Sequence, residues 1–436
     1  MINAPDIELR LQKRFKKLVK QHMSTAKGVA AGLRIPPQAE ASTAASLAAY
    51  RFYNNQRIDL VTTFEPILSQ LKATVSQCKQ WAIVLHDWSP LHYGGHKSKK
   101  DRVVLCAKND FGYMLQAAIL VSDRDGAPLQ PLYLGVEASD GVHSTRRESV
   151  LPRRSQMDEL NRTMGYIESL EIDKQIVHII DREADSRVHL RRFERCERKF
   201  IIRGNDLRTV EYEGTSCLLR EVEEKLKENF RFSREVEYKG KKAKQYVAET
   251  VVTLKEPGRQ KRRREGRLAY KTIPGKAICL RLILAQVRDK DGTILATWRL
   301  WTNLPKSVSA GKVALWYYWR WRIESYFKLL KRAGQHAEQW QQESAQTIAK
   351  RLTVAAQACV IVWALMGSKD KQAMPLRRLL IRLSGRLMKR DVEWTAPALL
   401  AGTWQLLAII DALDQYPLAH LREMGDLLHQ MLGLDT

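Results

Sequence analysis

Hydrophobic and polar positions follow helical spacing over the first 70 residues of this 436-residue chain. Between residues 9 and 20 the apolar side chains lie on one side of a predicted helix, and lysine and arginine cover the other side. After a break containing glycine and proline at 32–37, the alanine-rich segment 39–53 predicts a further helix. Helices with this many cations suit phosphate contacts, although a basic helix face is more often only solvated.

From residue 81 the pattern changes to short apolar runs rich in Val, Ile, Leu and Tyr, which predict strands. Four consecutive runs predict antiparallel hairpins, at 81–87, 103–106, 113–121 and 129–136. Further along, the pattern predicts a helix at 156–173, a buried strand at 175–181, a helix starting at 183 and a strand at 200–203. The runs that end at residues 87 and 181 both end in an aspartate.

Residues 205–297 read as an insertion with strand-like stretches at 246–254 and 277–287. The basic tract 259–264 between them cannot enter a core, so it is a loop or a phosphate-facing finger, and a loop is the commoner outcome. A strand and turn follow at 298–305, and helical patterns then dominate, at about 311–332, 353–366, 376–387 and 396–413. Strands followed by helices predict an α/β core flanked by helical domains.

The charge balance narrows the class of partner. Lys+Arg is 73 and Asp+Glu is 48, which gives a net charge of +25. A protein this basic is expected to meet a polyanion, and nucleic acid is the default. Composition alone does not separate a DNA enzyme from an RNA-binding protein.

Cysteine usage and hydropathy favour a cytoplasmic protein without a membrane partner. The 6 cysteines are scattered singly, so we expect neither a disulfide scaffold nor a zinc site. The longest apolar run, 352–366, is shorter than the roughly 18 residues of a membrane span. The early basic residues exclude an apolar secretory stretch at the N-terminus.

The segment 311–332 carries the most informative chemistry. On one helical face Glu324 would lie among four other polar groups, those of Tyr317, Arg320, Lys328 and Lys331. A neighbouring apolar stripe could pack on a core, and its members are Trp316, Trp319, Ile323, Phe327 and Leu330. Phosphodiester chemistry needs an acid for a metal and cations for phosphates, although Glu324 and Lys328 at i, i+4 also suit an ordinary surface helix.

Asp87 and Asp181 complete a possible set of metal ligands. Side chains at strand ends are common catalytic placements in α/β sheets, but a single aspartate there is usually a turn or cap residue. With Glu324 they form the minimal carboxylate set for two hard cations such as Mg²⁺. Two such ions about 3.5–4 Å apart can activate a water or a 3′-hydroxyl and stabilise the leaving oxygen.

These residues resemble the signatures of a known family. Tyr317, Arg320, Glu324 and Lys331 match the YREK spacing of bacterial DDE transposases of the insertion-sequence-four family. Asp181-Arg182-Glu183-Ala184-Asp185 is similar to the second-aspartate motif of the transposon-five subgroup, and 81–87 followed by Tyr93 resembles its first-aspartate strand. Ala49-Tyr50-Arg51-Phe52 resembles the end of its N-terminal DNA-binding domain.

The resemblance implies an α/β fold with a ribonuclease-H-like catalytic core. The domains would be a helical DNA-binding domain at 1–70, the core at 71–204 and 298–368, a β-rich insertion at 205–297 and a helical dimerisation region at 369–436. The implied activity is cut-and-paste DNA transposition of an insertion sequence by an endonuclease and strand transferase that uses Mg²⁺ or Mn²⁺, through a hairpin intermediate. The implied partners are double-stranded DNA, at terminal inverted repeats and target, and a second copy of the chain in a synaptic complex on the bacterial nucleoid.

The same resemblance assigns roles to single residues. Asp87, Asp181 and Glu324 would be the catalytic metal ligands. The residues that would contact DNA are Tyr317, Arg320, Lys328, Lys331, Arg203, Trp298 and Arg51. Trp298 would stack on a flipped base, although next to Trp301 it also suits a core tryptophan. One departure from many relatives is Trp88-Ser89 after the first aspartate, which could alter the surroundings of a metal without removing a ligand.

Two other interpretations stay open from the sequence. A catalytically silent DNA-binding protein would also be basic, but it gains nothing from three carboxylates facing phosphate. A repair or RNA nuclease on the same core would act on substrates that lack the ends of an element. Metal-dependent cutting excludes the first, and a preference for those ends excludes the second.

Overall fold

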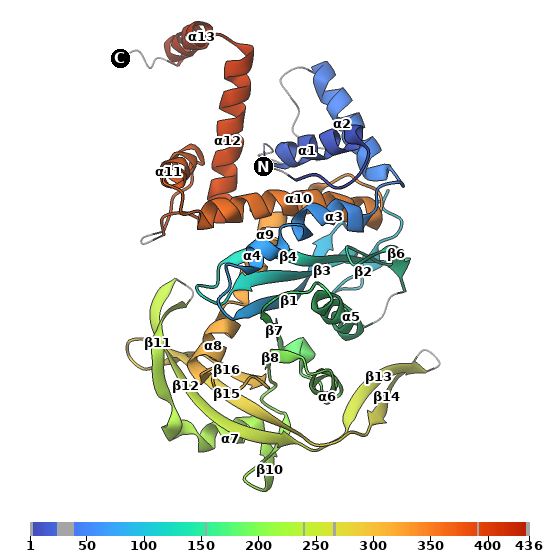
Figure 1. Ribbon diagram of the computed structural model, residues 1–436, viewed down its shortest axis with the longest axis vertical. Coiled ribbons are helices and arrows are strands. Elements are labelled where there is room, and N and C mark those ends of the chain that lie inside the picture. The colour runs from blue at the N-terminus through green and yellow to red at the C-terminus, as the bar shows by residue number, and fades with distance from the viewer. Residues whose placement is uncertain are drawn as a thin grey trace. The chain divides into compact units, whose positions relative to one another are not determined.

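A mixed sheet of 14 strands organises the protein, shown in Figure 1 as a computed structural model. The structure describes residues 3–23, 39–152, 155–238, 240–264, 267–389 and 392–432. In spatial order the main path of the sheet is β10 (Thr215–Leu218), β9 (Thr209–Tyr212), β12 (Lys241–Leu254), β15 (Ile278–Arg288), β16 (Ile294–Thr302), β8 (Lys199–Arg203), β7 (Gln175–Ile180), β1 (Trp81–His92), β3 (Phe111–Ser122), β4 (Pro128–Ala138), β5 (Gly141–Ser144) and β6 (Arg147–Leu151). In addition, β11 (Arg231–Tyr238) pairs with β12, and β2 (Val103–Val104) pairs with β3. The predicted mixed α/β class is confirmed.

The chain forms two compact units. The first, which we call the sheet unit, comprises Ile67–Pro90 and Met114–Ser325. The second, the helical unit, comprises Met1–Pro66, Leu91–Tyr113 and Tyr326–Thr436. The three candidate acids all belong to the sheet unit. The domain limits implied by the resemblance stay a prediction.

Parallel strands form the centre of the sheet unit. β7 pairs in parallel with both β1 and β8, whereas β8 pairs antiparallel with β16, and β3 with β4. Ile179 on β7 and Ile201 on β8 are fully buried, as expected for parallel strands covered on both faces. The apolar runs that predicted these strands therefore reflect burial on two sides.

The predicted insertion extends this same sheet. β12 pairs with β15, β15 with β16 and β16 with β8, all antiparallel. One part stands apart, because β13 (Gly258–Arg264) and β14 (Arg267–Ile273) form a separate two-stranded ladder. The expectation of a loop at 259–264 is therefore wrong. A hairpin satisfies its backbone hydrogen bonds without a core, so it tolerates a basic sequence.

Short helices pack on the sheet unit. Ser155 caps α5 by accepting a hydrogen bond from the backbone N–H of Asp158, and Ser309 caps α8 in the same way through Lys312. The helical elements of this unit are α4 (Leu71–Val75), α5 (Gln156–Glu168), η1 (Arg182–Ala184), α6 (Arg187–Arg195), α7 (Leu219–Lys225), η2 (Lys227–Asn229) and α8 (Ala310–Tyr318).

The helix predicted at 311–332 is broken, and this corrects the prediction. α8 ends at Tyr318 and α9 (Trp321–Leu330) begins after a turn. At the break the N–H of Arg320 donates to the carbonyl of Tyr317, three residues back, which tightens the chain. The Trp319 ring packs on the turn at Gly126, where an added Cβ would lie 2.4 Å from the ring. The predicted apolar stripe is buried as expected.

The helical unit has its own core. Phe15, Phe52 and Val354 meet there, and all three are buried. Its remaining helical elements are α1 (Leu9–Met23), α2 (Ala39–Asn54), most of α3 (Leu60–Leu68), η3 (Ala337–Gln339), α10 (Ala345–Gly367), α11 (Ala373–Leu383), α12 (Ala396–Gln415) and α13 (Leu418–Met431). They confirm the predicted helices. The predicted break at 32–37 lies outside the described residues.

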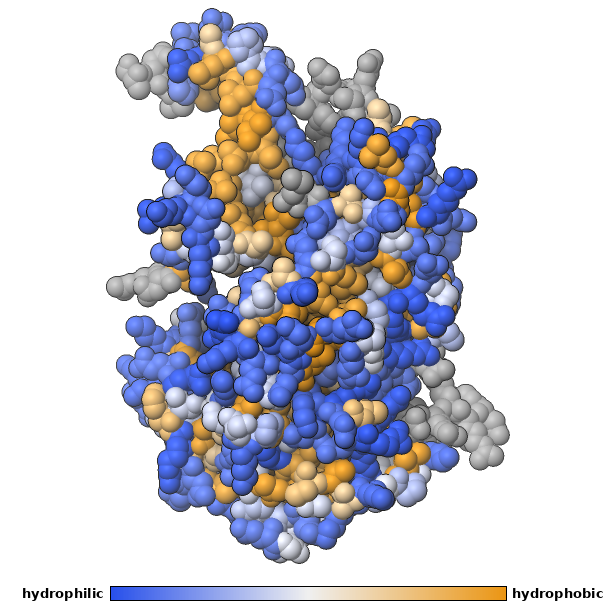
Figure 2. Space-filling model, in the orientation of Figure 1, coloured by the Kyte–Doolittle hydropathy of each residue, from blue (hydrophilic) through white to orange (hydrophobic). Residues whose placement is uncertain are grey.

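Two helices of this unit, α10 and α12, are long and apolar enough to cross a membrane by length and composition alone. The length of α10 was underestimated from the apolar run 352–366, because the helix extends beyond that run at both ends. α10 is a core helix, because 83% of its apolar window is buried inside the protein. Only 28% of the α12 window is buried, and apolar side chains gather on the surface along α12 (Figure 2).

Candidate active site

The register of two parallel strands brings the aspartates to one edge of the sheet. Asp87 lies on β1, and Asp181 directly follows β7. Leu85 is opposite Ile179, so the same register continued by two residues brings Asp87 level with Asp181. The two apolar runs are therefore neighbouring strands, as the placement of the aspartates required.

Arg320 joins the two aspartates to Glu324. Its Nη1 lies 3.0 Å from Oδ2 of Asp87, and its Nη2 lies 3.0 Å from Oε1 of Glu324 and 3.6 Å from Oδ2 of Asp181. The Arg320 side chain is 6% exposed, whereas those of Asp87, Asp181 and Glu324 are 21%, 34% and 32% exposed. Three acids from distant parts of the chain thus surround one buried cation and remain open to solvent.

This position of Arg320 differs from the predicted one. We expected the residue to share an open helix face with Lys328 and to bind phosphate. Arg320 instead lies in the break between α8 and α9, and its guanidinium is buried. A buried guanidinium needs anionic partners to offset its lost hydration. Its Nε has no hydrogen-bond partner among the residues that the structure describes.

Burial and charge act differently on the two aspartates. Burial raises the pKa of Asp87 to about 6, and Arg320 and the backbone N–H of Trp88 oppose the rise only in part. Burial also acts on Asp181, but Arg320, the backbone N–H of Arg182 and the Tyr317 hydroxyl outweigh it and lower the pKa of that carboxyl. The negative charge of Asp87 is therefore the more weakly stabilised of the two.

Two residues contact Asp181, namely Tyr317 and Arg203, and Trp298 packs on Tyr317. The Tyr317 hydroxyl donates to Oδ1 of Asp181 at 2.9 Å, and Arg203 Nη1 lies 3.9 Å from the same oxygen. The Trp298 ring is buried 5.9 Å from the Tyr317 ring. Stacking of Trp298 on a base would therefore require the indole to leave this aromatic contact, and its predicted role stays a prediction.

The other predicted DNA contacts belong to the helical unit. Lys328 on α9 and Arg51 in the last turn of α2 are exposed. Lys331 forms an ion pair with Glu338, Nζ to Oε1, at 3.2 Å. Contacts of these three residues with phosphate stay predictions.

The donor set suits a hard divalent cation, because carboxylate oxygens are the ligands that Mg²⁺ and Mn²⁺ accept. The carboxylates here surround a guanidinium. Within the described ranges no group of three His, Cys, Asp or Glu side chains is arranged to hold one metal ion. Asp87, Asp181 and Glu324 are the residues that would hold a cation, and Arg320 would first have to release them.

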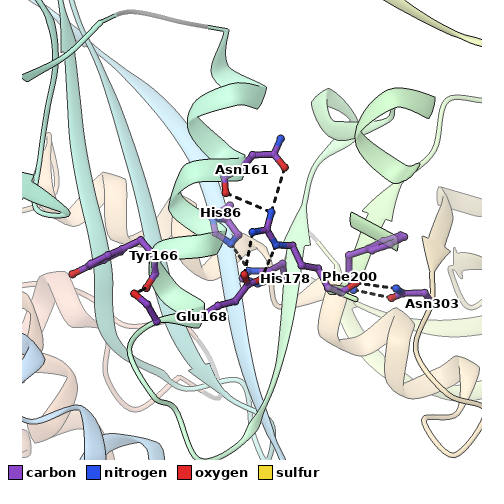
Figure 3. Close-up of polar contacts among 9 residues, drawn as sticks. His86, Asn161, Tyr166, Glu168, His178, Phe200 and Asn303 are labelled. Carbon is purple, nitrogen blue, oxygen red and sulfur yellow. Dashed lines mark hydrogen bonds and ion pairs between the residues drawn. The ribbon is translucent and has the colours of Figure 1, made fainter. Parts of the chain in front are cut away.

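Sequence reasoning missed a chain of polar contacts that runs from two buried histidines behind this edge to the exposed Glu168 (Figure 3). His86 Nε2 lies 2.8 Å from Nδ1 of His178 on β7, and His178 Nε2 lies 3.6 Å from Oε1 of Glu168. Arg198 donates to both oxygens of Glu168, at 2.7 and 3.0 Å. Burial lowers the pKa of both histidines, which favours their neutral forms. The sequence carried no local signal for this chain, because the histidines meet only through the register of β1 and β7.

The polar chain reaches a surface pocket of about 640 Å³. Trp81, Gln175 and Lys199 line it, and they begin strands β1, β7 and β8. Asp87 and Asp181 lie toward the other ends of these strands. The pocket is therefore distinct from the carboxylate cluster.

Comparison with known proteins adds no assignment, since no protein-family model and no curated protein match this chain.

Proposed function

We propose that this protein is a metal-dependent DNA transposase that cuts and joins DNA at the ends of an insertion sequence. The observation that carries the proposal is the convergence of Asp87, Asp181 and Glu324 on one guanidinium within 3.6 Å. Like charges brought together destabilise a fold, so such clusters are typical of functional sites. The YREK spacing and the Asp181 motif support the same reading.

The chain's own residues have distinct tasks in this proposal. When bound, a divalent metal supplies Lewis acidity at the scissile phosphate and activates a water or 3′-hydroxyl. Asp87, Asp181 and Glu324 hold the metal. Arg320, released from them, binds a phosphate oxygen pair with its planar fork. Tyr317 and Arg203 orient the Asp181 carboxylate.

The finer fold in this proposal is a ribonuclease-H-like core with a β-rich insertion, a DNA-binding N-terminal domain and a C-terminal dimerisation region. What supports the core is the parallel centre formed by β1, β7 and β8, with two aspartates at one edge. An acid supplied by a helix, Glu324 on α9, completes the set.

The proposed partners are duplex DNA and a second copy of the chain. A net charge of +25 favours a polyanion, and α1 carries exposed cations, namely Arg10, Lys13, Lys16, Lys17 and Lys20. The exposed apolar residues of α12 and α13, among them Ile410, Leu413, Leu427 and Leu428, suit a protein–protein contact in a dimer. The proposed location is the bacterial cytoplasm, on the nucleoid.

The direct test uses the DNA that flanks the gene. Purified protein is incubated with a duplex spanning that flank, with Mg²⁺ or Mn²⁺, and with an unrelated duplex of equal length. We expect strand breaks at the boundary of a terminal repeat, none in EDTA, and none in the unrelated duplex.

The two alternatives give different results in this test. A silent DNA-binding protein would bind the flank and cut nothing with metal. The ion pairs of Arg320 with all three acids favour this alternative. A repair or RNA nuclease would cut the unrelated duplex, or RNA, as readily as the flank.

A further inference from the structure

The hairpin β13–β14 forms a basic arm that leaves the sheet between β12 and β15 (Figure 1). Its sequence contains the cations Arg259, Lys261, Arg262, Arg263, Arg264, Arg267 and Lys271. An isolated two-stranded hairpin is at best marginally stable in water, so its direction depends on how its two feet are held. The feet are 254–258, which enters the arm, and 273–278, which leaves it.

Arg191 on α6 bridges both feet. Its Nη2 donates to the carbonyl of Glu256 at 2.8 Å and to that of Lys255 at 3.2 Å, on the entering foot. Its Nε donates to the carbonyl of Lys276 at 2.7 Å, on the leaving foot. One planar guanidinium thus holds the two ends of the arm together.

Two further contacts seat the arm on the same helix. Arg187 Nη2 lies 2.6 Å from Oε2 of Glu256. Gly258 lies so close to α6 that an added Cβ would be 2.4 Å from Cγ2 of Val188. The entering foot is therefore packed against the helix as well as hydrogen-bonded to it.

The same helix is tied to the segment that contains Asp181. α6 starts at Arg187. Asp185, which lies between Asp181 and Arg187 in the chain, accepts a hydrogen bond from the N–H of Asn205 at 2.7 Å and forms an ion pair with Arg208 at 3.1 Å. A clamp on α6 therefore fixes the arm relative to the carboxylate edge within the sheet unit.

From this geometry we infer that Arg191 is a positioning residue, which orients the basic arm for the phosphate backbone of duplex DNA that reaches the carboxylate cluster. The inference rests on the proposed function. Its physical basis is preorganisation: an arm already held in place loses little conformational freedom on binding, whereas a loose arm must be ordered by the DNA.

A direct contact of Arg191 with phosphate would be a different role, and lysine separates the two. Lysine keeps the charge that a phosphate contact needs. It lacks the rigid fork that reaches the carbonyls of Glu256 and Lys276 together. Arg191→Lys should therefore lose the clamp and keep the charge.

The experiment compares the full chain with Arg191→Lys and Arg191→Ala. Arg192→Ala is the matched control, because Arg192 is the exposed neighbour on the same helix. Hydrogen exchange is measured at 254–258 and 273–278 in the free proteins, and affinity for a mixed-sequence duplex is measured over a range of salt. Thermal unfolding checks that each variant is folded.

We expect faster exchange at both feet in the two Arg191 variants, and exchange like that of the unchanged protein in Arg192→Ala. We expect the Arg191→Lys variant to bind about 5- to 10-fold more weakly at every salt concentration, because the cost of ordering the arm is conformational. Unchanged binding by Arg191→Lys overturns the inference, and so does weaker binding without faster exchange at the feet. Failure of the unchanged protein to bind the duplex would instead contradict the proposed function.

Discussion

At the scale of single residues, the site is an electrostatic balance between three carboxylates and Arg320. Burial raises the pKa of Asp87 and so opposes its ionisation, whereas the neighbours of Asp181 lower the pKa of that carboxyl and stabilise its anion. A divalent cation would replace the guanidinium as the counter-charge.

The first prediction concerns the stability of aspartate variants in EDTA. The folded pKa of Asp87, about 6, is above its value of about 3.9 in an unfolded chain, so the charged form costs stability above pH 6 and the cost disappears as the pH falls toward 4. Asp87→Asn should therefore raise the free energy of unfolding at pH 7.5 by about 1–3 kcal/mol, with the gain lost near pH 4.

For Asp181→Asn we expect the opposite change in the free energy of unfolding. The folded pKa of Asp181 is lowered, so its charge contributes stability above the unfolded pKa, and that contribution is lost as the pH falls through the folded value. This variant should be less stable than the unchanged protein at pH 7.5. Urea unfolding at pH 7.5 and 4.5 measures both, and a destabilised Asp87→Asn at pH 7.5 would contradict the electrostatic reading.

The second prediction concerns Arg320→Ala. Removing the buried cation leaves three carboxylates facing one another, which should lower the free energy of unfolding by about 2–4 kcal/mol at pH 7.5. Millimolar Mg²⁺ should restore stability to this variant more than to the unchanged protein, because the carboxylates are then free to bind it. Thermal unfolding with and without Mg²⁺ measures the effect.

Arg322→Ala is the control for this experiment, because Arg322 is an exposed arginine that lies close to Arg320 in the chain, at the start of α9. It should change neither stability nor the response to Mg²⁺. An equal Mg²⁺ shift in Arg320→Ala and in the unchanged protein would show that the three acids do not bind the cation.

At the scale of elements, the strands and helices followed from local patterns, and the break between α8 and α9 did not. Apolar periodicity is the same on both sides of Trp319, so nothing local ends the helix. The cause is tertiary, because Trp319 packs on the turn at Gly126 and Arg320 enters the carboxylate cluster. Helical spacing therefore placed Arg320 correctly beside Glu324, but it put the side chain on an open helix face and not in the carboxylate cluster.

The third prediction tests that turn. Gly126 has φ 72° and no room for a Cβ beside Trp319, so Gly126→Ala should cost about 2–4 kcal/mol through strain and through displacement of the indole. Gly292 has a similar φ of 84° but open space around it, so Gly292→Ala should cost only about 1 kcal/mol. Equal losses in urea unfolding would mean that the packing on Trp319 does not support the turn.

The fourth prediction concerns the basic arm. Arg262→Glu should weaken binding to duplex DNA and reduce the slope of log affinity against log salt by about 1, because one phosphate contact is lost. Lys290→Glu, in the exposed turn between β15 and β16, is the charge-matched control and should leave the slope nearly unchanged. Equal slopes for both variants would remove the arm from the DNA contact.

At the scale of the whole molecule, the sequence was sufficient for the α/β class and for the strands that bear the two aspartates. It also picked out Glu324 as the third acid. It could not show the buried pair His86–His178, whose partner residues are set by the register of β1 and β7. The grouping of segments into two units was equally hidden, since it joins residues distant in the chain. Local patterns identify elements, and long-range pairing decides what those elements bring together.

We propose above that Asp87, Asp181 and Glu324 together form a metal-dependent centre that cuts DNA. The most direct measurement is single-turnover cleavage of the flank duplex with Mn²⁺ by Glu324→Gln, beside Glu235→Gln, which changes an exposed acid of the same unit. We expect Glu324→Gln to bind the duplex normally and to cut it at least about 100-fold more slowly, and we expect Glu235→Gln to cut it normally. Cleavage by Glu324→Gln at the rate of the unchanged protein would show that these three acids are not the cutting centre.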